Sequence, residues 1–103
     1  MSAEPTLVEP LYLEGCPGID RVVPVVAPLA EAAGARVVRR RVETPDEAEA
    51  QRFLGSPTVR VNGHDVEPHA DARTDFGLKC RLYRTPDGLG GTPADEWILA
   101  AVT

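Results

Sequence analysis

At 103 residues the chain has room for one domain, spanning 1–103, and chains of this size bury about two thirds of their unfolded surface. Apolar residues make up 43% and charged residues 26%, a globular balance that excludes a disordered or collagen-like chain. The net charge of -5 disfavours nucleic acid as a partner. Residues 1–5 lack the features of a secretory signal, and no apolar run approaches the ~20 residues that cross a bilayer. We therefore expect a cytoplasmic protein without a membrane partner, in which a pair of reduced cysteines is more often chemical or metal-binding than structural.

The first segments predict a strand followed by a helix. Residues 6–13 read as the strand, although Pro10 cannot donate to a ladder and therefore indicates an edge position or a bulge. The helix has Pro17 at its first position and stops at Gly34. Two prolines inside the helical pattern predict a kink, and these are Pro24 and Pro28. The apolar residues at helical spacing are Ile19, Val22, Val23, Val26, Leu29, Ala30 and Ala33.

The middle of the chain predicts a second strand and a second helix. Residues 35–42 are rich in β-branched side chains, and the triplet Arg39–Arg41 is either a solvated strand end or an anion contact. Thr44 is a helix cap, Pro45 takes the first helical position, and Glu47 completes a capping box. The helix is expected to run to position 54, and its expected buried residues are Ala50, Phe53 and Leu54.

A hairpin is expected next. Ser56-Pro57 leads directly into a third strand at 58–61. Asn62-Gly63 is a strong hairpin signal and predicts a returning fourth strand at 64–67.

The last third of the chain contains an insertion and a final helix. Residues 68–92 form the insertion, in which 78–83 alternates like a half-buried strand. The residues expected on the inner face of that strand are Leu78, Cys80 and Leu82. The final helix is expected to begin with Thr92 as its cap, and its apolar residues are Trp97, Ile98, Ala101 and Val102.

The predicted order is β-α-β-α-β-β-α, which indicates an α/β fold with a mixed sheet flanked by helices. Gly15-Cys16-Pro17 opens the first helix, and Gly55-Ser56-Pro57-Thr58-Val59 enters the third strand. With these motifs the chain resembles the thioredoxin and glutaredoxin superfamily over about residues 6–67 and the final helix. When Asn62-Gly63 and Gly77-Leu78-Lys79-Cys80-Arg81-Leu82-Tyr83 are added, it looks more closely like a group of small bacterial thioredoxin-like proteins. Some members of that group carry an organomercurial-lyase label.

The resemblance implies a site around Cys16. It implies that Cys16 is the reactive cysteine, that Pro57 is cis, and that the backbone of Ser56 binds an extended thiol partner. The implied substrate-binding residues are Pro17, Ser56, Pro57 and Thr58. The usual Cys-x-x-Cys motif reads Cys-Pro-Gly-Ile here, with Ile19 in place of the resolving cysteine. Dithiol chemistry within the motif is therefore excluded, and no cofactor is expected.

The chemistry of Cys16 follows from its place at a helix N-terminus. Exposed backbone N–H groups and the helix dipole favour a thiolate there, and a thiolate is both a nucleophile and a metal ligand. The alternative is that Cys16 is a small buried hydrophobe. Asp20 lies one turn further on the same helix face, either as a proton donor or acceptor or as a solvated residue.

Cys80 gains a role if the insertion folds back over the helix end. It could then form a disulfide with Cys16, resolve a mixed disulfide, or share a soft metal ion with Cys16. The alternative is that Cys80 packs into the core with its apolar neighbours. His64 and His69 fit no standard zinc spacing, so we interpret them as ordinary surface residues and expect no structural metal site.

Three functions remain open from the sequence. The first is a thiol-dependent redox protein with Cys16 and Cys80 as catalytic residues, acting on a protein or low-molecular-weight thiol or disulfide. The second is a dithiol protein that binds a soft metal ion or an organomercurial. The third is a non-catalytic interaction module, which the missing resolving cysteine supports.

Overall fold

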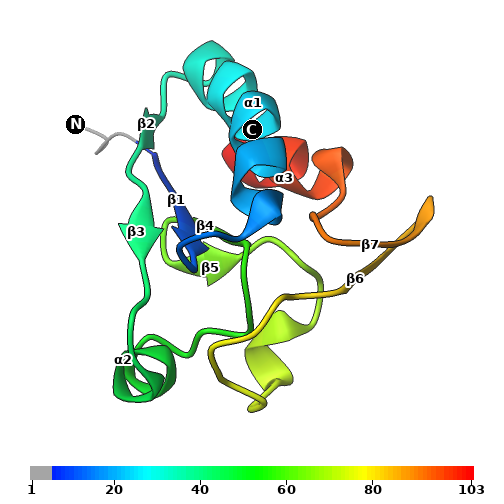
Figure 1. Cartoon of the computed structure of the whole chain (residues 1–103). Coiled ribbons are helices and arrows are strands. Elements are labelled where there is room, and N and C mark those ends of the chain that lie inside the picture. Colours follow the sequence, from blue (N-terminus) through cyan, green and yellow to red (C-terminus); the bar gives the residue numbers. More distant parts are fainter. Residues whose placement is uncertain (1–5) are drawn as a thin grey trace.

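The computed structural model describes residues 6–103, so the prediction made for residues 1–5 lies outside the described residues. Over the described residues the fold is α/β, with a mixed sheet and three helices (Figure 1). The main sheet contains β1 (Leu7–Tyr12), β2 (Arg36–Val37), β3 (Arg40–Arg41), β4 (Thr58–Val61) and β5 (His64–Asp65). A separate hairpin consists of β6 (Tyr83–Thr85) and β7 (Gly88–Gly90). The helices are α1 (Pro17–Ala32), α2 (Pro45–Ala50) and α3 (Asp95–Val102), and a 3₁₀ turn lies at Ala70–Ala72. Within residues 6–103, no helix combines the length and the apolar composition that crossing a membrane requires.

Strand β1 lies at the centre of the sheet, which corrects the prediction from Pro10. It pairs in parallel with β2 and β3 and antiparallel with β4, and β5 pairs with β4. Pro10 is buried in this central strand, opposite Val59. The ladder of β2 ends opposite Val8 and that of β3 begins opposite Leu11, so the parallel pairing is interrupted beside Pro10. A residue without an N–H group is tolerated at such a gap, and the predicted strand 35–42 accordingly forms two short strands.

Two apolar clusters lie on opposite faces of this sheet, since Val8 and Leu11 of β1 point to opposite sides. The first cluster joins β1 and β4 to α1 and α3 through Val8, Ile19, Val22, Val26, Ala30, Val59, Val61, Ile98 and Val102. The second joins β1 to α2 through Leu11, Val42, Ala48 and Phe53. The predicted core face of α1 is confirmed at these positions, whereas Ala33 lies beyond the helix end and is exposed. The helix is continuous through Pro24 and Pro28.

Helix α2 begins where the sequence predicts and ends earlier. The backbone N–H of Glu47 donates to Thr44 Oγ1 at 3.1 Å, which confirms the cap. The helix ends at Ala50, and Arg52 adopts a left-handed φ of 53° in the turn that follows. Ala50 is therefore exposed instead of buried, while Ala48 is buried. The predicted burial of Phe53 and Leu54 is confirmed.

The hairpin at Asn62-Gly63 is confirmed, with φ values of 52° and 85° at the two turn residues. The returning strand is shorter than predicted, because pairing with β4 stops at Asp65. Helix α3 begins at Asp95, with Ala94 and not Thr92 as its cap. Its core residues are Ile98 and Val102, whereas Trp97 is half-buried and Ala101 is exposed.

The 78–83 segment buries the face opposite to the predicted one. Arg81 and Tyr83 are buried, at 3% and 0% exposed. Leu78, Leu82 and Cys80 are exposed. The predicted strand at 78–83 is not formed: Cys80 makes an isolated bridge, and the strand β6 begins only at Tyr83. The alternation in burial is present, but its inner face contains a charged and an aromatic residue.

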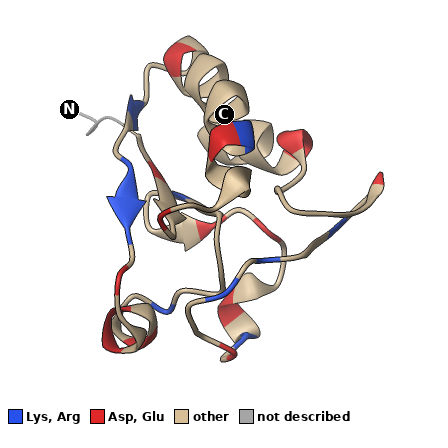
Figure 2. Cartoon of the chain, in the orientation of Figure 1, with Lys and Arg blue, Asp and Glu red and all other residues tan. Residues whose placement is uncertain are grey.

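The basic triplet lies on the surface beside acidic neighbours (Figure 2). Arg40 pairs with Glu9, and Arg41 reaches Glu14 at 2.8 Å and Glu43 at 3.2 Å. The guanidinium carbon of Arg39 lies 5.1 Å from the centre of the Tyr12 ring. The three arginines therefore lie on an exposed edge of the sheet, and each has a partner within the chain.

Candidate functional site

Cys16 lies immediately before α1, at the position that caps the helix. Its backbone is extended, with φ and ψ of -77° and 119°, and its N–H donates to Leu13 O at 3.2 Å. Pro17 occupies the first turn of the helix, and its side chain is exposed. Cys16 itself is buried, at 7% exposed, as the alternative of a small buried hydrophobe also predicts.

The turn Ser56-Pro57 packs against the chain on both sides of Cys16, at Leu13 and at Gly18. Its peptide bond is cis, as the resemblance implies. The side chain of Ser56 accepts a hydrogen bond from the backbone N–H of Leu13 at 3.0 Å. A Cβ atom added to Gly18 of α1 would lie 2.6 Å from Cδ of Pro57, so the helix contacts the proline ring closely at this point. Thr58 is buried behind the turn and donates to Gly55 O at 2.6 Å.

A short segment of the insertion, residues 79–81, lies along the other side of the turn; we call it the strap. The N–H of Ser56 donates to Lys79 O at 2.8 Å, and the N–H of Arg81 donates to Ser56 O at 2.9 Å. These bonds form an isolated parallel bridge between Ser56 and Cys80. The resemblance assigns the backbone of Ser56 to a thiol partner, but in this structure both its N–H and its carbonyl oxygen are hydrogen-bonded to the strap.

The bridge places Cys80 on the side of the turn that faces the loop before α1. Residues paired across a bridge direct their side chains to the same face, and the side chain of Ser56 points to Leu13. Cys80 is exposed and both cysteines are free thiols. The interpretation of Cys80 as a core residue is therefore wrong. The structure brings Cys80 and the residues on both sides of Cys16 to the same turn.

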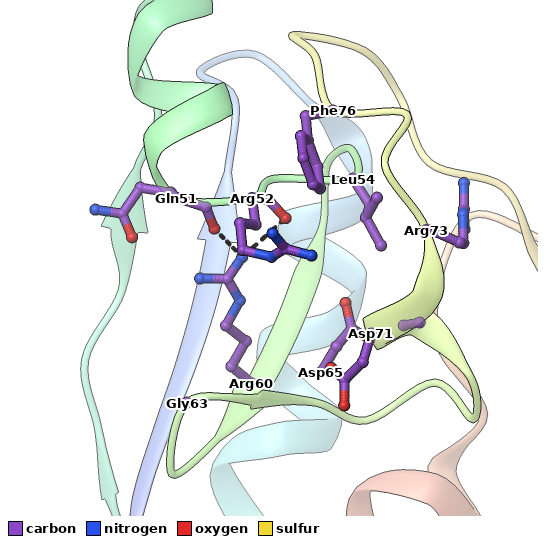
Figure 3. A pocket seen from close by; sticks show the side chains of 10 residues that line it. Gln51, Arg52, Leu54, Arg60, Gly63, Asp65, Asp71, Arg73 and Phe76 are labelled. Carbon is purple, nitrogen blue, oxygen red and sulfur yellow. Dashed lines mark hydrogen bonds between the residues drawn. The ribbon is translucent and has the colours of Figure 1, made fainter.

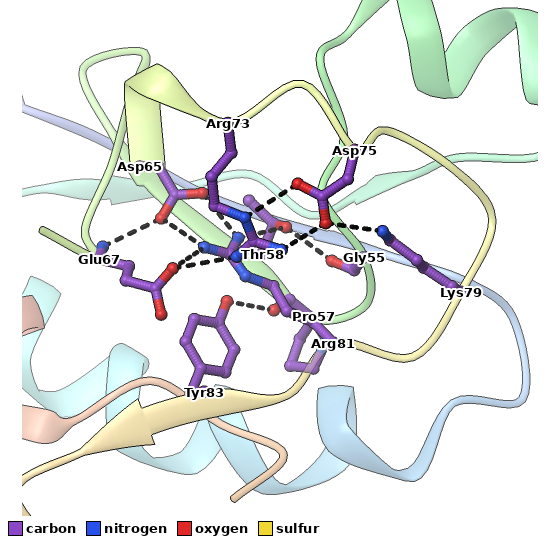
Figure 4. Close-up of polar contacts among 10 residues, drawn as sticks. All are labelled: Gly55, Pro57, Thr58, Asp65, Glu67, Arg73, Asp75, Lys79, Arg81 and Tyr83. Atoms are coloured by element: carbon purple, nitrogen blue, oxygen red, sulfur yellow. Dashed lines mark hydrogen bonds and ion pairs between the residues drawn. The ribbon is translucent and has the colours of Figure 1, made fainter. Parts of the chain in front are cut away.

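A largely buried ion cluster that the sequence reasoning missed holds the strap against the sheet (Figure 4). The two terminal nitrogens of Arg81 reach Asp65 at 2.6 and 3.1 Å, and one of them reaches Glu67 at 3.0 Å. Thr58 Oγ1 accepts a further bond at 3.0 Å. Burial acts to lower the pKa of Arg81, but the hydrogen bonds and charges of the carboxylates outweigh it and raise that pKa. The available signal was an arginine inside an alternating apolar run, together with acidic residues at alternate positions after the hairpin.

Tyr83 completes the support of the turn. Its hydroxyl donates to Pro57 O at 2.6 Å, and its ring lies 4.3 Å from the guanidinium carbon of Arg81. The ring also contacts Trp97 of α3, with the two centres 6.4 Å apart. Burial raises the pKa of Tyr83 far above its usual range, so the phenol stays protonated while the protein is folded.

An exposed ion cluster lies at the outer end of the strap. Asp75 accepts from Lys79 at 2.9 Å and from Arg73 at 2.6 Å. The hydrogen bonds from Arg73 and then Lys79 lower the pKa of Asp75. Because these side chains are about half exposed, solvent and salt weaken the pairs, and the cluster contributes little to stability.

A cavity of about 100 Å³ lies away from the cysteines, between the end of α2, the β4–β5 hairpin and the start of the insertion (Figure 3). Its charged lining is mixed, and includes Arg52, Arg60, Asp65 and Asp71. Arg60 donates to the backbone carbonyl oxygens of Gln51 and Arg52, and thereby caps the end of α2. Burial lowers the pKa of Arg60. None of the site residues predicted from the sequence lines this cavity.

The part of the chain that the structure describes contains no group of three histidine, cysteine or acidic side chains suited to a metal ion. His64 and His69 are both exposed, as predicted. The sequence matches no protein-family model, no curated protein matches it, and no solved structure matches its fold. The turn, the strap and the two thiols are therefore the features of the chain that bear on its function.

Proposed function

We propose that the chain is a thioredoxin-like, thiol-dependent redox protein that uses Cys16 and Cys80. One observation carries the proposal: Ser56-Pro57 contacts the loop that leads into Cys16 and is bridged to Cys80 itself. The strand order β2-β1-β4-β5, with β4 and β5 antiparallel to their neighbours, is compatible with the thioredoxin-like topology that the sequence motifs imply.

The chemistry is a two-step exchange with a disulfide partner. The thiolate of Cys16 attacks one sulfur of the partner, a mixed disulfide forms, and the first partner thiolate leaves. The thiolate of Cys80 then attacks the sulfur of Cys16, the Cys16–Cys80 disulfide forms, and the second partner thiolate leaves. The two cysteines supply two electrons to the partner and release their two protons. A low-molecular-weight thiol or dithiol reductant returns the protein to its reduced state.

The geometry favours a small partner over an extended peptide. Cys16 is 7% exposed, and an extended chain finds both backbone groups of Ser56 bonded to the strap. A peptide would have to displace residues 79–81, whereas a small disulfide would not. We therefore expect a low-molecular-weight disulfide to react faster than a protein disulfide.

The test is to mix the reduced protein with oxidised glutathione and follow the mass of the intact chain. The wild-type chain should lose the mass of two hydrogens and keep no adduct, because Cys80 resolves the mixed disulfide. Cys80→Ser should stop at a glutathione adduct on Cys16. Cys16→Ser is the matched control and should form no intramolecular disulfide. Consumption of glutathione disulfide by Cys16→Ser at the wild-type rate would refute the proposal.

A second candidate is the binding of a soft metal ion between the two thiolates. The observation that favours it is the convergence of two free cysteines on one turn. Thiolates select soft ions such as Cu(I), and Hg(II) belongs to the same class. Titration of the reduced protein with Cu(I) or Hg(II) should give one ion per chain, and Cys80→Ser should lose it. If neither glutathione disulfide nor these ions engage the thiols, the non-catalytic interaction module remains.

A further inference from the structure

Besides its two backbone hydrogen bonds to Ser56, the strap that carries Cys80 is held to the sheet mainly by one of its own side chains, that of Arg81. Leu78 and Leu82, on either side of the strap, are 38% and 64% exposed and supply little apolar burial. The pair between Lys79 and Asp75 is also exposed. The side chain of Arg81, by contrast, is 1% exposed, and its partners belong to the sheet and the chain just after it.

We infer that Arg81 is a positioning residue for Cys80: its buried guanidinium fixes the strap against Ser56, and thereby sets how often the Cys80 thiol meets Cys16. The inference rests on the proposed dithiol chemistry. Arg81 does not touch the partner or the reacting sulfurs in this role.

The backbone connects the anchor to the thiol. Arg81 directly follows Cys80 in the chain. Its backbone N–H donates to Ser56 O, and its side chain binds Asp65 and Glu67. Successive side chains of an extended segment point to opposite sides, so an inward Arg81 directs Cys80 to the other side, which is that of the Ser56 side chain and Leu13. Rotation or slippage of the strap would require the guanidinium to leave both carboxylates.

The anchor depends on the shape of arginine. Two terminal nitrogens reach the two oxygens of Asp65, and the same nitrogens also reach Thr58 and Glu67. A lysine ammonium is a single point charge and cannot hold this fork. Arg81→Lys therefore keeps the charge of the cluster and removes the geometry that fixes the strap.

The first test measures the equilibrium between the Cys16–Cys80 disulfide and glutathione, which gives the effective concentration of one thiol at the other. We expect a wild-type value well above the roughly millimolar limit of thiols joined by a flexible chain. In Arg81→Lys the value should fall at least about tenfold toward that limit. Arg84→Lys is the matched control, because Arg84 is exposed on β6, and it should leave the value unchanged. If Arg81→Lys fails to fold, Glu67→Gln removes one carboxylate charge from Arg81 and should lower the value by a smaller factor.

The second test reports position without disulfide chemistry. A nitroxide label on Cys80, in the Cys16→Ser chain, should give the spectrum of a restrained side chain, and Arg81→Lys should make it mobile. If the wild-type protein forms no intramolecular disulfide, the proposed function is refuted. If the motion of the label still depends on Arg81 in that case, the positioning role stands. Folded Arg81→Lys with wild-type equilibrium and wild-type label motion would overturn the positioning role.

Discussion

The contact between Gly18 and Pro57 gives a prediction in which two effects oppose each other. In a helix, replacing glycine by alanine normally stabilises by up to about 1 kcal/mol, and by less in the first turn. Here the new Cβ atom would lie 2.6 Å from Cδ of Pro57 and 3.3 Å from Gly91 O. The proline ring is buried and cannot move aside as a flexible side chain would. Overpacking of this kind costs about 1–3 kcal/mol, so we expect Gly18→Ala to be destabilising by roughly 0–2 kcal/mol.

Urea denaturation of the reduced protein measures this difference. Gly77→Ala is the control, since a Cβ atom there meets nothing within 4 Å, and its effect should stay within about 0.5 kcal/mol. The variant should also weaken the equilibrium between the Cys16–Cys80 disulfide and glutathione, because the helix end must shift away from the turn. A Gly18→Ala protein that gains the full propensity term of about 1 kcal/mol would refute the close contact.

Three further predictions concern other parts of the fold. Tyr83→Phe should cost about 1–3 kcal/mol, because Pro57 O loses its buried donor. The wild type should lose stability above about pH 10, where an unfolded tyrosine ionises and the folded Tyr83 does not, and Tyr83→Phe should lack that component in a pH series of urea midpoints. Thr44→Ala should cost about 1 kcal/mol in thermal unfolding, because the N–H of Glu47 loses its acceptor, whereas Thr44→Ser should be nearly neutral. Leu82→Ser should change the free energy of unfolding by less than about 0.5 kcal/mol, and a loss of core magnitude would contradict the exposure of Leu82.

The local signals in the sequence predicted the elements that depend on neighbours along the chain. Thr44 with Glu47 marked the start of α2, and Asn62-Gly63 marked the hairpin. Each relies on contacts within a few residues, which a sequence displays directly. The cis state of Pro57 was predicted as well, but from the resemblance and not from such a contact.

Local signals failed at two helix ends, since α2 ends at Ala50 and Ala94 caps α3, whereas the errors around the candidate site concern contacts between distant segments. An alternating run has two faces, and the apolar one at Leu78 and Leu82 was the natural inner face by composition. The structure buries the face with Arg81 because Arg81 forms ion pairs there with Asp65 and Glu67. These pairs depend on how the hairpin packs against the insertion. In the same way, the central place of Pro10 depends on a gap in its partner strands.

The hydrogen bonds of the turn also determine which parts of the chain unfold together. The N–H and O of Ser56 and the O of Pro57 have their partners in residues 79–83, and Ser56 and Pro57 are buried. Removing the insertion would leave three main-chain groups without partners in the interior, which is a far greater loss than trimming an ordinary surface loop. The insertion and the turn therefore form one cooperative unit, and the amide protons of Ser56 and Arg81 should exchange with solvent through the same opening event.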